Sequence, residues 1–297
     1  MAIHIGTRVL YGPSGTEPTS PTEGSEWWDS TTNVLNVYDG TNWRTTSATA
    51  QAINIAALDT TFMYFDFGDY AGSSWQGNTS ATTLTNIESG TSTQGLNLPR
   101  GNAAYNAANG GILRGSSTEN VRSTFSATNP HGTNGMSMGV VVRFDSGSDN
   151  STSPSRGLIY YGNTSSDDHL YVRKNFTAAN DIRVGEDTNG SDIWTQAFTG
   201  LTSADGFMVL IFNHASDGTL SVSRDGEAFT TIRSEGSYIS VTNPNVGLFG
   251  DPYNDNESSF DIGAAYWRSA VTTNEEAAGW FSYLKTDYGA GSNRFAL

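Results

Sequence analysis

The sequence of 297 residues contains no cysteine and only two lysines among its 15 basic residues. Without cysteine the chain forms neither a disulfide framework nor a thiolate metal site, so its stability must come from a packed core or from assembly. Charged residues make up only 15%, and 30 of them are acidic, which gives a net charge of −15. Such a surface repels phosphate backbones and argues against nucleic acid as a partner.

Long apolar segments are absent as well. The longest apolar run is Phe207–Phe212, far short of the roughly 18 residues needed to span a bilayer. Residues 1–8 hold no apolar stretch that would predict a secretory signal. We therefore expect a chain that is made in the cytoplasm and is not inserted into a membrane.

The residues that are abundant indicate an all-β protein. Aromatic residues reach 11% and glycines number 33, and strands favour aromatic residues while turns favour glycine. Candidate strands recur about every ten residues between residues 62 and 267, as in a sandwich or jelly roll. Within this series, Phe207–Phe212 predicts a central strand buried on both faces. Leu220–Phe229, with Asp225 and Gly226 in its middle, predicts a β-hairpin.

One helix is expected near the C-terminus. Two overlapping capping boxes precede it, Thr272 with Glu275 and Thr273 with Glu276, and the sequence does not choose between them. The apolar residues that then share one helical face are Ala277, Trp280, Phe281, Leu284 and Tyr288. Gly289 is expected to end the helix.

Residues 1–48 form a separate segment, which small residues link to the remainder, 49–297. The stretch Pro21–Trp43 places three tryptophans among turn residues and predicts a small hairpin with Asp39-Gly40 in a turn. A module of this size is too small to bury such rings alone, so we expect them to pack against the rest of this chain, a copy of itself or a host particle. The expected anchoring residues are Trp27, Trp28, Leu35, Val37, Tyr38 and Trp43.

This segment resembles a short module that recurs near the ends of virion proteins of tailed bacteriophages, especially tail fibres and head fibres. The matching residues are Pro21, Gly24, Trp27, Trp28, Asp29, Asn33, Leu35, Val37, Tyr38, Asp39, Gly40 and Trp43. The resemblance implies a structural protein of the phage particle surface, either a tail fibre or a capsid decoration protein. Its partners would be other virion proteins and sister copies of the same chain. The sister copies would form a homo-oligomer, for which a trimer is possible.

The remainder resembles concanavalin A-like lectin/glucanase domains of the laminin G type. The resemblance rests on the order of three segments, Gly135–Phe144, Asp217–Gly226 and the strand Phe260–Trp267 followed by a helix. It implies a two-sheet jelly-roll sandwich of about 14 strands. The expected fold is thus all-β: a small N-terminal β-hairpin module, a concanavalin A-like jelly roll and one short C-terminal helix. The jelly roll would bind glycans, for example in host attachment.

Catalysis is not expected. Ser137 lies in a Gly-x-Ser-x-Gly pattern, but a strand follows where a nucleophile elbow needs a helix. The alternating carboxylates of the glucanases, which must lie about 5 Å apart for a retaining mechanism, have no counterpart in the sequence. The four histidines show no zinc-ligand spacing. We therefore predict no enzyme activity.

Two kinds of binding site remain as candidates. Aromatic residues near turns could contact a glycan, although each could equally pack in the core: Trp75, Tyr161, Trp194 and Tyr253. The segment 251–257 gathers hard oxygen donors of the kind that calcium prefers, although these residue types also form ordinary turns. The candidate ligands are Asp251, Asn254, Asp255 and Glu257, and no other cofactor is expected.

An alternative interpretation keeps the jelly roll and changes its setting. The chain would then be a free carbohydrate-binding lectin or a degenerate glycanase. A spacer without a ligand is a third class, and a glycan array together with a hydrolysis assay separates the three.

Overall fold

A computed structural model describes residues 10–12, 15, 17–23, 25–29, 34–38, 40–45, 55, 58, 61–66, 83–84, 96–97, 104–106, 112–114, 121–124, 134–144, 156–163, 168–175, 180–188, 191–234, 245–248 and 260–286. The chain divides into two compact units, Met1–Gln51 and Ala52–Leu297. The division falls close to the boundary predicted at residue 48.

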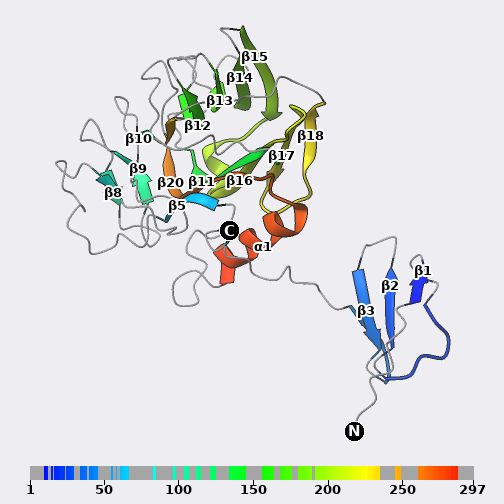
Figure 1. Cartoon of the computed structure of the whole chain (residues 1–297). Helices are drawn as coiled ribbons and strands as arrows, with labels where there is room; N and C mark the ends of the chain where they lie inside the picture. Colours follow the sequence, from blue (N-terminus) through cyan, green and yellow to red (C-terminus); the bar gives the residue numbers. More distant parts are fainter. Residues whose placement is uncertain are drawn as a thin grey trace. The chain divides into compact units, whose positions relative to one another are not determined.

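The first unit holds a sheet in the order β1-β2-β3-β4, of which Figure 1 labels β1, β2 and β3. Its strands are β1 (Leu10–Gly12), β2 (Glu26–Asp29), β3 (Val34–Tyr38) and β4 (Trp43–Thr45). The predicted hairpin is confirmed, because β2, β3 and β4 pair in antiparallel fashion. Gly40 in the turn before β4 has a φ of 91°, which favours glycine. The sequence does not predict β1, which runs parallel to β2 and places Leu10 opposite Trp27.

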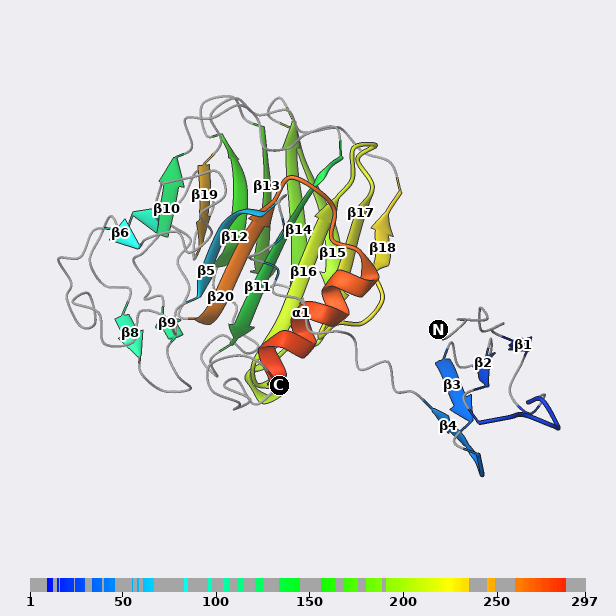
Figure 2. The same cartoon turned by 60° about the horizontal axis from the view of Figure 1, so that its bottom comes forward.

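The second unit is a sandwich of two antiparallel sheets with one α-helix among its described residues (Figure 2), which confirms the predicted jelly-roll architecture. Sheet I has the order β18-β17-β16-β11-β20-β9-β8, and β5 also pairs with β20. Its strands are β5 (Thr61–Asp66), β8 (Ala104–Asn106), β9 (Ile112–Arg114), β11 (Met136–Arg143), β16 (Met208–His214), β17 (Leu220–Arg224), β18 (Thr230–Arg233) and β20 (Asp261–Arg268).

Sheet II has the order β15-β14-β13-β12-β19-β10-β7-β6. Its strands are β6 (Thr83–Leu84), β7 (Leu96–Asn97), β10 (Val121–Thr124), β12 (Arg156–Asn163), β13 (Asp168–Asn175), β14 (Asp181–Thr188), β15 (Ser191–Phe198) and β19 (Asn245–Leu248). A short 3-10 helix, η4 (Ser203–Asp205), lies between β15 and β16 and begins with a capping box on Thr202.

The main core lies between the sheets and draws apolar side chains from both. Phe144 packs edge-on against Phe260 at 4.8 Å between ring centroids. The indole of Trp267 in sheet I donates a hydrogen bond of 3.0 Å to the carbonyl of Tyr160 in sheet II. Strand β16 lies between β17 and β11, and each of its residues is buried. The prediction of a central strand buried on both faces is therefore confirmed.

The predicted hairpin also forms, from β17 and β18. Asp225 and Gly226 both have positive φ, 52° and 78°, and Glu227 N–H donates to the carbonyl of Arg224 at 2.9 Å. This is the geometry that a tight Asp-Gly turn requires. A Cβ on Gly226 would lie 2.9 Å from the Cβ of Phe281, so the turn also packs closely against the C-terminal helix.

Helix α1 (Asn274–Thr286) packs across the outward face of sheet I (Figure 2). Thr273 and Glu276 form the capping box, with Glu276 N–H donating to Thr273 Oγ1 at 3.1 Å. Ala277, Trp280 and Leu284 are fully buried against the sheet, and Phe281 is partly buried. Tyr288 and Gly289 lie outside the described residues. Sheet I is thus covered on both faces, by sheet II on one side and by α1 on the other.

Candidate functional site

The outward face of sheet II carries a row of aromatic and glycine residues that crosses five strands. Its members are Gly247, Tyr160, Tyr171, Gly185 and Trp194, each directly opposite the next in the strand pairing. The residues beside them on β12, β13 and β19 point into the core, since side chains alternate along a strand. We call this set the aromatic row.

Glycine allows the rings of the row to lie close to the sheet. A Cβ on Gly185 would be 2.7 Å from ring atoms of both Tyr171 and Trp194, closer than any side chain tolerates. The two rings meet edge to face, with centroids 4.5 Å apart and planes at 84°. Gly247 has the same relation to Tyr160, because its Cβ would lie 2.3 Å from that ring. The glycines therefore fix the position of the rings.

Exposure along the row increases toward the edge of the sheet. Tyr160 is 1% exposed and Tyr171 5% exposed, whereas Trp194 on the edge strand β15 is only half-buried. A ligand that reaches the row would therefore meet Trp194 first.

Two arginines lie beside the row on the same face. Arg173 and Arg183 are directly opposite each other on β13 and β14, and Gln196 follows on β15. The guanidinium carbon of Arg173 is 3.3 Å from the centroid of the Trp194 ring, which is a cation–π contact. Arg183 Nη2 lies 3.9 Å from the carboxylate of Asp181. The edge of sheet II thus offers an aromatic ring, two guanidinium groups and an amide within one small area.

This combination suits the binding of polar ring compounds. An aromatic ring packs against an apolar face, and planar guanidinium groups donate several hydrogen bonds in a fixed geometry. The ring and the Arg173 guanidinium already hold each other in place, so little side-chain freedom would be lost on binding.

The structure places the residues predicted to bind a glycan in different environments. Trp194 belongs to the aromatic row. The prediction for Tyr161 is wrong, because this side chain is 0% exposed and lies in the core between the sheets. Trp75 and Tyr253 lie outside the described residues. Sequence reasoning missed Tyr171 and the arginines, which only the strand register brings together.

The predicted calcium ligands, Asp251, Asn254, Asp255 and Glu257, also lie outside the described residues. Within the part of the chain that the structure describes, no group of three or more His, Asp or Glu side chains could hold a metal ion. In the same part, no helix has the length and apolarity needed to cross a membrane.

The anchoring residues of the first unit also differ in environment. Trp27 is only 3% exposed and its ring lies 6.1 Å from that of Trp43. The expectation that the unit cannot bury its own rings is therefore wrong for Trp27, which is a core residue. Val37, Tyr38 and Trp43 are partly exposed, and the Tyr38 and Trp43 rings are 5.4 Å apart. For Trp28 and Leu35 only the backbone, in β2 and β3, is described.

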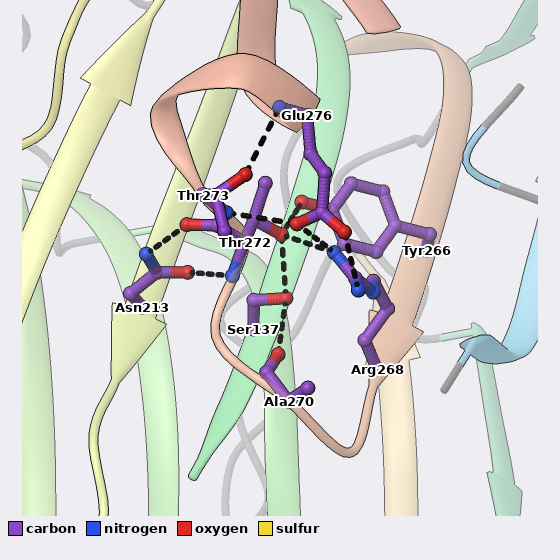
Figure 3. Close-up of polar contacts among 8 residues, drawn as sticks. All are labelled: Ser137, Asn213, Tyr266, Arg268, Ala270, Thr272, Thr273 and Glu276. Atoms are coloured by element: carbon purple, nitrogen blue, oxygen red, sulfur yellow. Dashed lines mark hydrogen bonds and ion pairs between the residues drawn. The ribbon is translucent and has the colours of Figure 1, made fainter. Parts of the chain in front are cut away.

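A polar network lies on the outward face of sheet I, and Ser137 is part of it (Figure 3). The hydroxyl of Ser137 donates to the carbonyl of Ala270 at 2.9 Å and lies 2.8 Å from the hydroxyl of Thr272. The Tyr266 hydroxyl and Arg268 Nη1 reach the same Thr272 oxygen at 2.9 and 3.1 Å. Burial raises the pKa of Tyr266 to about 12, so it remains protonated.

The same network anchors helix α1. The Asn213 side chain donates to the Thr272 carbonyl at 2.8 Å and accepts from its N–H at 2.9 Å. Arg268 binds both carboxylate oxygens of Glu276, at 2.9 and 3.1 Å. Burial raises the pKa of Glu276, but hydrogen bonds from Arg268 and from Thr273 N–H outweigh it, so the pKa is lowered. Ser137 therefore connects the sheet to the start of the helix.

A third polar cluster joins the two sheets in the interior. Glu186 on β14 lies 3.2 Å from His214 Nε2 on β16 and also contacts Arg233 on β18. Glu186 and His214 are fully buried, and burial lowers the pKa of Arg233. The cluster connects strands that do not share a sheet, next to the edge that carries Trp194.

No family model matches the sequence, and no curated protein matches it. Several solved structures share its fold. Domain 4 of an extracellular GH43 arabinanase from Geobacillus stearothermophilus, in complex with arabinotriose, is 12% identical, with a TM-score of 0.53 over 74% of this chain and 98% of that domain. The binding domain of botulinum neurotoxin DC, in complex with SialylT, is 12% identical, with a TM-score of 0.56 over 76% of this chain and 52% of that one.

A sialidase from Trypanosoma rangeli, in complex with sialic acid, is 9% identical, with a TM-score of 0.50 over 77% of this chain and 33% of the sialidase. The chain thus spans about half of the neurotoxin domain and a third of the sialidase. At these identities the likeness establishes the jelly-roll sandwich and leaves the ligand to be argued from the residues.

Proposed function

We propose that the second unit is a non-catalytic carbohydrate-binding domain and that the edge of sheet II around Trp194 is its binding surface. The observation that carries the proposal is the position of the Trp194 ring. It is half-buried, held over Gly185, flanked by Tyr171 at 4.5 Å and stacked on Arg173 at 3.3 Å. A sugar ring would pack against the exposed part of this group, and Arg173, Arg183 and Gln196 would bind its hydroxyl groups.

The comparisons support the proposal by their ligands. The arabinanase domain was solved with arabinotriose, the neurotoxin domain with SialylT and the sialidase with sialic acid. These proteins share the fold of this chain at low identity, so the ligand class is proposed here and the particular sugar is not carried over.

A binding role without catalysis fits the polar groups that the structure describes. The Ser137 hydroxyl is engaged with Ala270 and Thr272, and Glu186 is enclosed between the sheets. A calcium ion at residues 251–257 stays a prediction, and a titration followed by melting with and without chelator would test it.

The test of the binding proposal is a glycan array probed with the full chain and with Trp194→Ala. We expect binding by the wild type and its loss in the variant, because the packing surface is removed. Ile193→Ala is the matched control, since Ile193 is the neighbouring residue on β15, is 42% exposed and points away from the row. Binding that survives Trp194→Ala, or an array without any hit, would contradict the proposal.

We propose further that the protein belongs to the surface of a tailed-phage particle, as a tail fibre or a capsid decoration protein, and that its first unit docks on other virion proteins or on sister copies. The sequence pattern of residues 21–43 supports this assignment. The partly exposed Tyr38 and Trp43, together with Val37, are the described side chains that such a contact would bury. Many copies on one particle would multiply a weak affinity for surface glycans.

The docking proposal has two measurements. Analytical ultracentrifugation of the full chain should show an oligomer that Tyr38→Ala/Trp43→Ala weakens, whereas Thr41→Ala/Asn42→Ala in the exposed turn should not. Purified phage particles from the strain that encodes the chain should contain it when probed with an antibody. A monomer that is also missing from particles would overturn the virion assignment.

The alternative setting is a free lectin or a degenerate glycanase. It is favoured if the array identifies a glycan while particles lack the chain. Turnover of that glycan in a hydrolysis assay would contradict the non-catalytic proposal.

A further inference from the structure

The strands at the ends of the two sheets differ in length. Strand β15, at one end of sheet II (Figure 1), has eight residues, whereas the other end strands, β6, β8 and β18, have two, three and four. Strand β5, which pairs with β20 outside this order, has six. An edge strand presents unpaired backbone N–H and C=O groups on its outer side, and natural proteins commonly keep such strands short. Strand β15 is thus the longest edge among the described strands.

Strand β15 also lacks the usual protection of an edge. Its sequence, Ser-Asp-Ile-Trp-Thr-Gln-Ala-Phe, contains no lysine, no proline and a single ionisable residue, Asp192, in a chain whose net charge is −15. Among the described strands only β14 pairs with it, and the one bulge in that pairing lies beyond Gln196, so the ladder from Ser191 to Gln196 is regular. Charges, proline and bulges keep edges from pairing, so this edge is suited to accept another strand.

An apolar side chain is exposed at the same edge. Ile193 lies opposite Glu186, which is fully buried between the sheets, so Ile193 points to the core side of sheet II. It is nevertheless 42% exposed, and it is the only exposed large apolar residue in the part of the chain that the structure describes. A further strand beside β15 would cover this side chain.

We infer that β15 pairs in antiparallel fashion with β15 of a second copy, so that sheet II continues across a two-fold axis. The axis is perpendicular to the sheet, because core-facing residues must stay opposite core-facing residues in the joined sandwich. In the register centred on Trp194, this residue lies opposite the partner's Trp194, and Ile193 lies opposite the partner's Thr195. Aromatic pairs and pairs of β-branched residues at such positions stabilise a sheet.

The same register avoids a pair of like charges. Asp192 falls opposite the partner's Gln196, whereas a register centred on Asp192 would place two acidic residues opposite each other, which is destabilising. The strand is therefore complementary to itself, as an isologous interface requires. This self-complementarity favours a second copy over an unrelated peptide as the occupant of the edge.

The dimer would join two copies of the proposed glycan surface. Opposite residues of an antiparallel pair have Cα atoms about 4.5–5.5 Å apart, so the two Trp194 side chains would form one surface on the outward face of the extended sheet. This consequence rests on the glycan-binding role proposed above, whereas the pairing of the strands does not.

Sedimentation tests the pairing in the full chain with Tyr38→Ala/Trp43→Ala, which weakens any contact through the first unit. We expect a dimer on this background. Ile193→Lys should raise its dissociation constant at least about tenfold, because an edge lysine must lose its hydration when the strands pair. Alanine at this position would leave the backbone ladder intact and is not used here. Ser216→Lys, which adds the same charge in the exposed turn between β16 and β17, is the matched control and should leave the dimer unchanged.

Cross-linking tests the register, because the chain contains no cysteine of its own. On the same background, Trp194→Cys places two thiols across the axis, where the Cα separation is within the range of a disulfide. Gln196→Cys is the matched control, since two residues along the same face it would lie about 13 Å from its own copy, too far for a disulfide. We expect oxidation to give a covalent dimer of Trp194→Cys on a non-reducing gel and its loss in Gln196→Cys.

The outcomes separate the pairing from the glycan-binding role. A monomer on this background, or equal cross-linking of the two cysteine variants, would overturn the pairing and leave the glycan-binding role. A dimer that cross-links as expected and binds no glycan would support the pairing and contradict that role. Weaker binding of Ile193→Lys to a glycan array, together with loss of the dimer, would support the shared surface.

Discussion

The outward faces of the two sheets share one local arrangement, a tyrosine packed over a glycine, but differ in what that arrangement does. In sheet I, Tyr266 lies over Gly139 on the neighbouring strand, where a Cβ would be 2.0 Å from the ring. In sheet II, Tyr171 lies in the same way over Gly185. A tyrosine over a cross-strand glycine is therefore a way of packing a ring flat on a sheet and does not by itself indicate a binding site.

The difference between the two faces lies in what covers them. In sheet I, helix α1 brings Trp280 edge-on to Tyr266 at 4.9 Å, and the Tyr266 hydroxyl is bound by Thr272. In sheet II, the row ends at the half-exposed Trp194 beneath a guanidinium group. Exposure and charge, and not the aromatic content of a face, therefore separate a packing surface from a candidate binding surface.

Replacing one tryptophan on each face is the strongest test of this contrast. Trp280→Ala should lower the free energy of unfolding by about 3–5 kcal/mol, because a fully buried large side chain leaves a cavity. Trp194→Ala should cost about 1 kcal/mol, as for an aromatic contact at a half-exposed position, and should abolish glycan binding. Circular dichroism in a denaturant titration measures the stability of both variants, and calorimetry measures glycan binding by Trp194→Ala. A larger loss of stability for Trp194→Ala would reverse the assignment of the two faces.

Adding a methyl group to one glycine on each face should give smaller effects. Gly139→Ala should destabilise by about 1–3 kcal/mol, the usual range for an overpacked core, because Tyr266 is enclosed by the helix. Gly185→Ala should destabilise less, since Trp194 can move toward solvent, while binding weakens as the ring leaves its position. Melting temperatures and binding titrations of both variants check this order. Equal losses of stability would show that the face of sheet II is as rigidly enclosed as that of sheet I.

The smallest predicted effect concerns Glu276, and it depends on pH. Since the pKa of this group is lowered on folding, its contribution to stability is complete above the unfolded pKa of about 4.3. The contribution is lost as the pH falls through the lower pKa of the folded state. Glu276→Gln should therefore lower the free energy of unfolding by about 1 kcal/mol at pH 7, as for loss of a helix cap, and by less near pH 3.

The exposed Glu275, one residue earlier in α1, provides the control for this experiment. Glu275→Gln should change the melting temperature little at either pH. A stability difference for Glu276→Gln that persists unchanged at pH 3 would show that its hydrogen bonds do not depend on the carboxylate charge.

Much of the fold could be predicted because local signals agreed with it. The apolar run of β16, the Asp225-Gly226 turn and the Thr273–Glu276 capping box each lie where the structure has the corresponding element. The choice between the two capping boxes depended on long-range packing, because Thr272 is drawn into the network around Ser137 and Tyr266.

The candidate site could be predicted only in part, and a bulge in β12 decides which of its two tyrosines faces outward. Simple alternation from the buried Leu158 would turn Tyr160 inward and Tyr161 outward. The pairing of β12 with β13 shifts between Gly157 and Ile159, so Leu158 and Ile159 are both buried and the alternation changes phase. Tyr160 therefore joins the aromatic row and Tyr161 the core.

The place of β20 in sheet I sets the timing of folding during synthesis. Strand β11, with three consecutive buried valines, pairs on one side with β20, which leaves the ribosome roughly 120 residues later, or about 6–24 s at ~5–20 residues per second. Until then an apolar strand edge is open to other nascent chains. This open edge is therefore the place where a chaperone would protect the nascent chain until its last strand arrives.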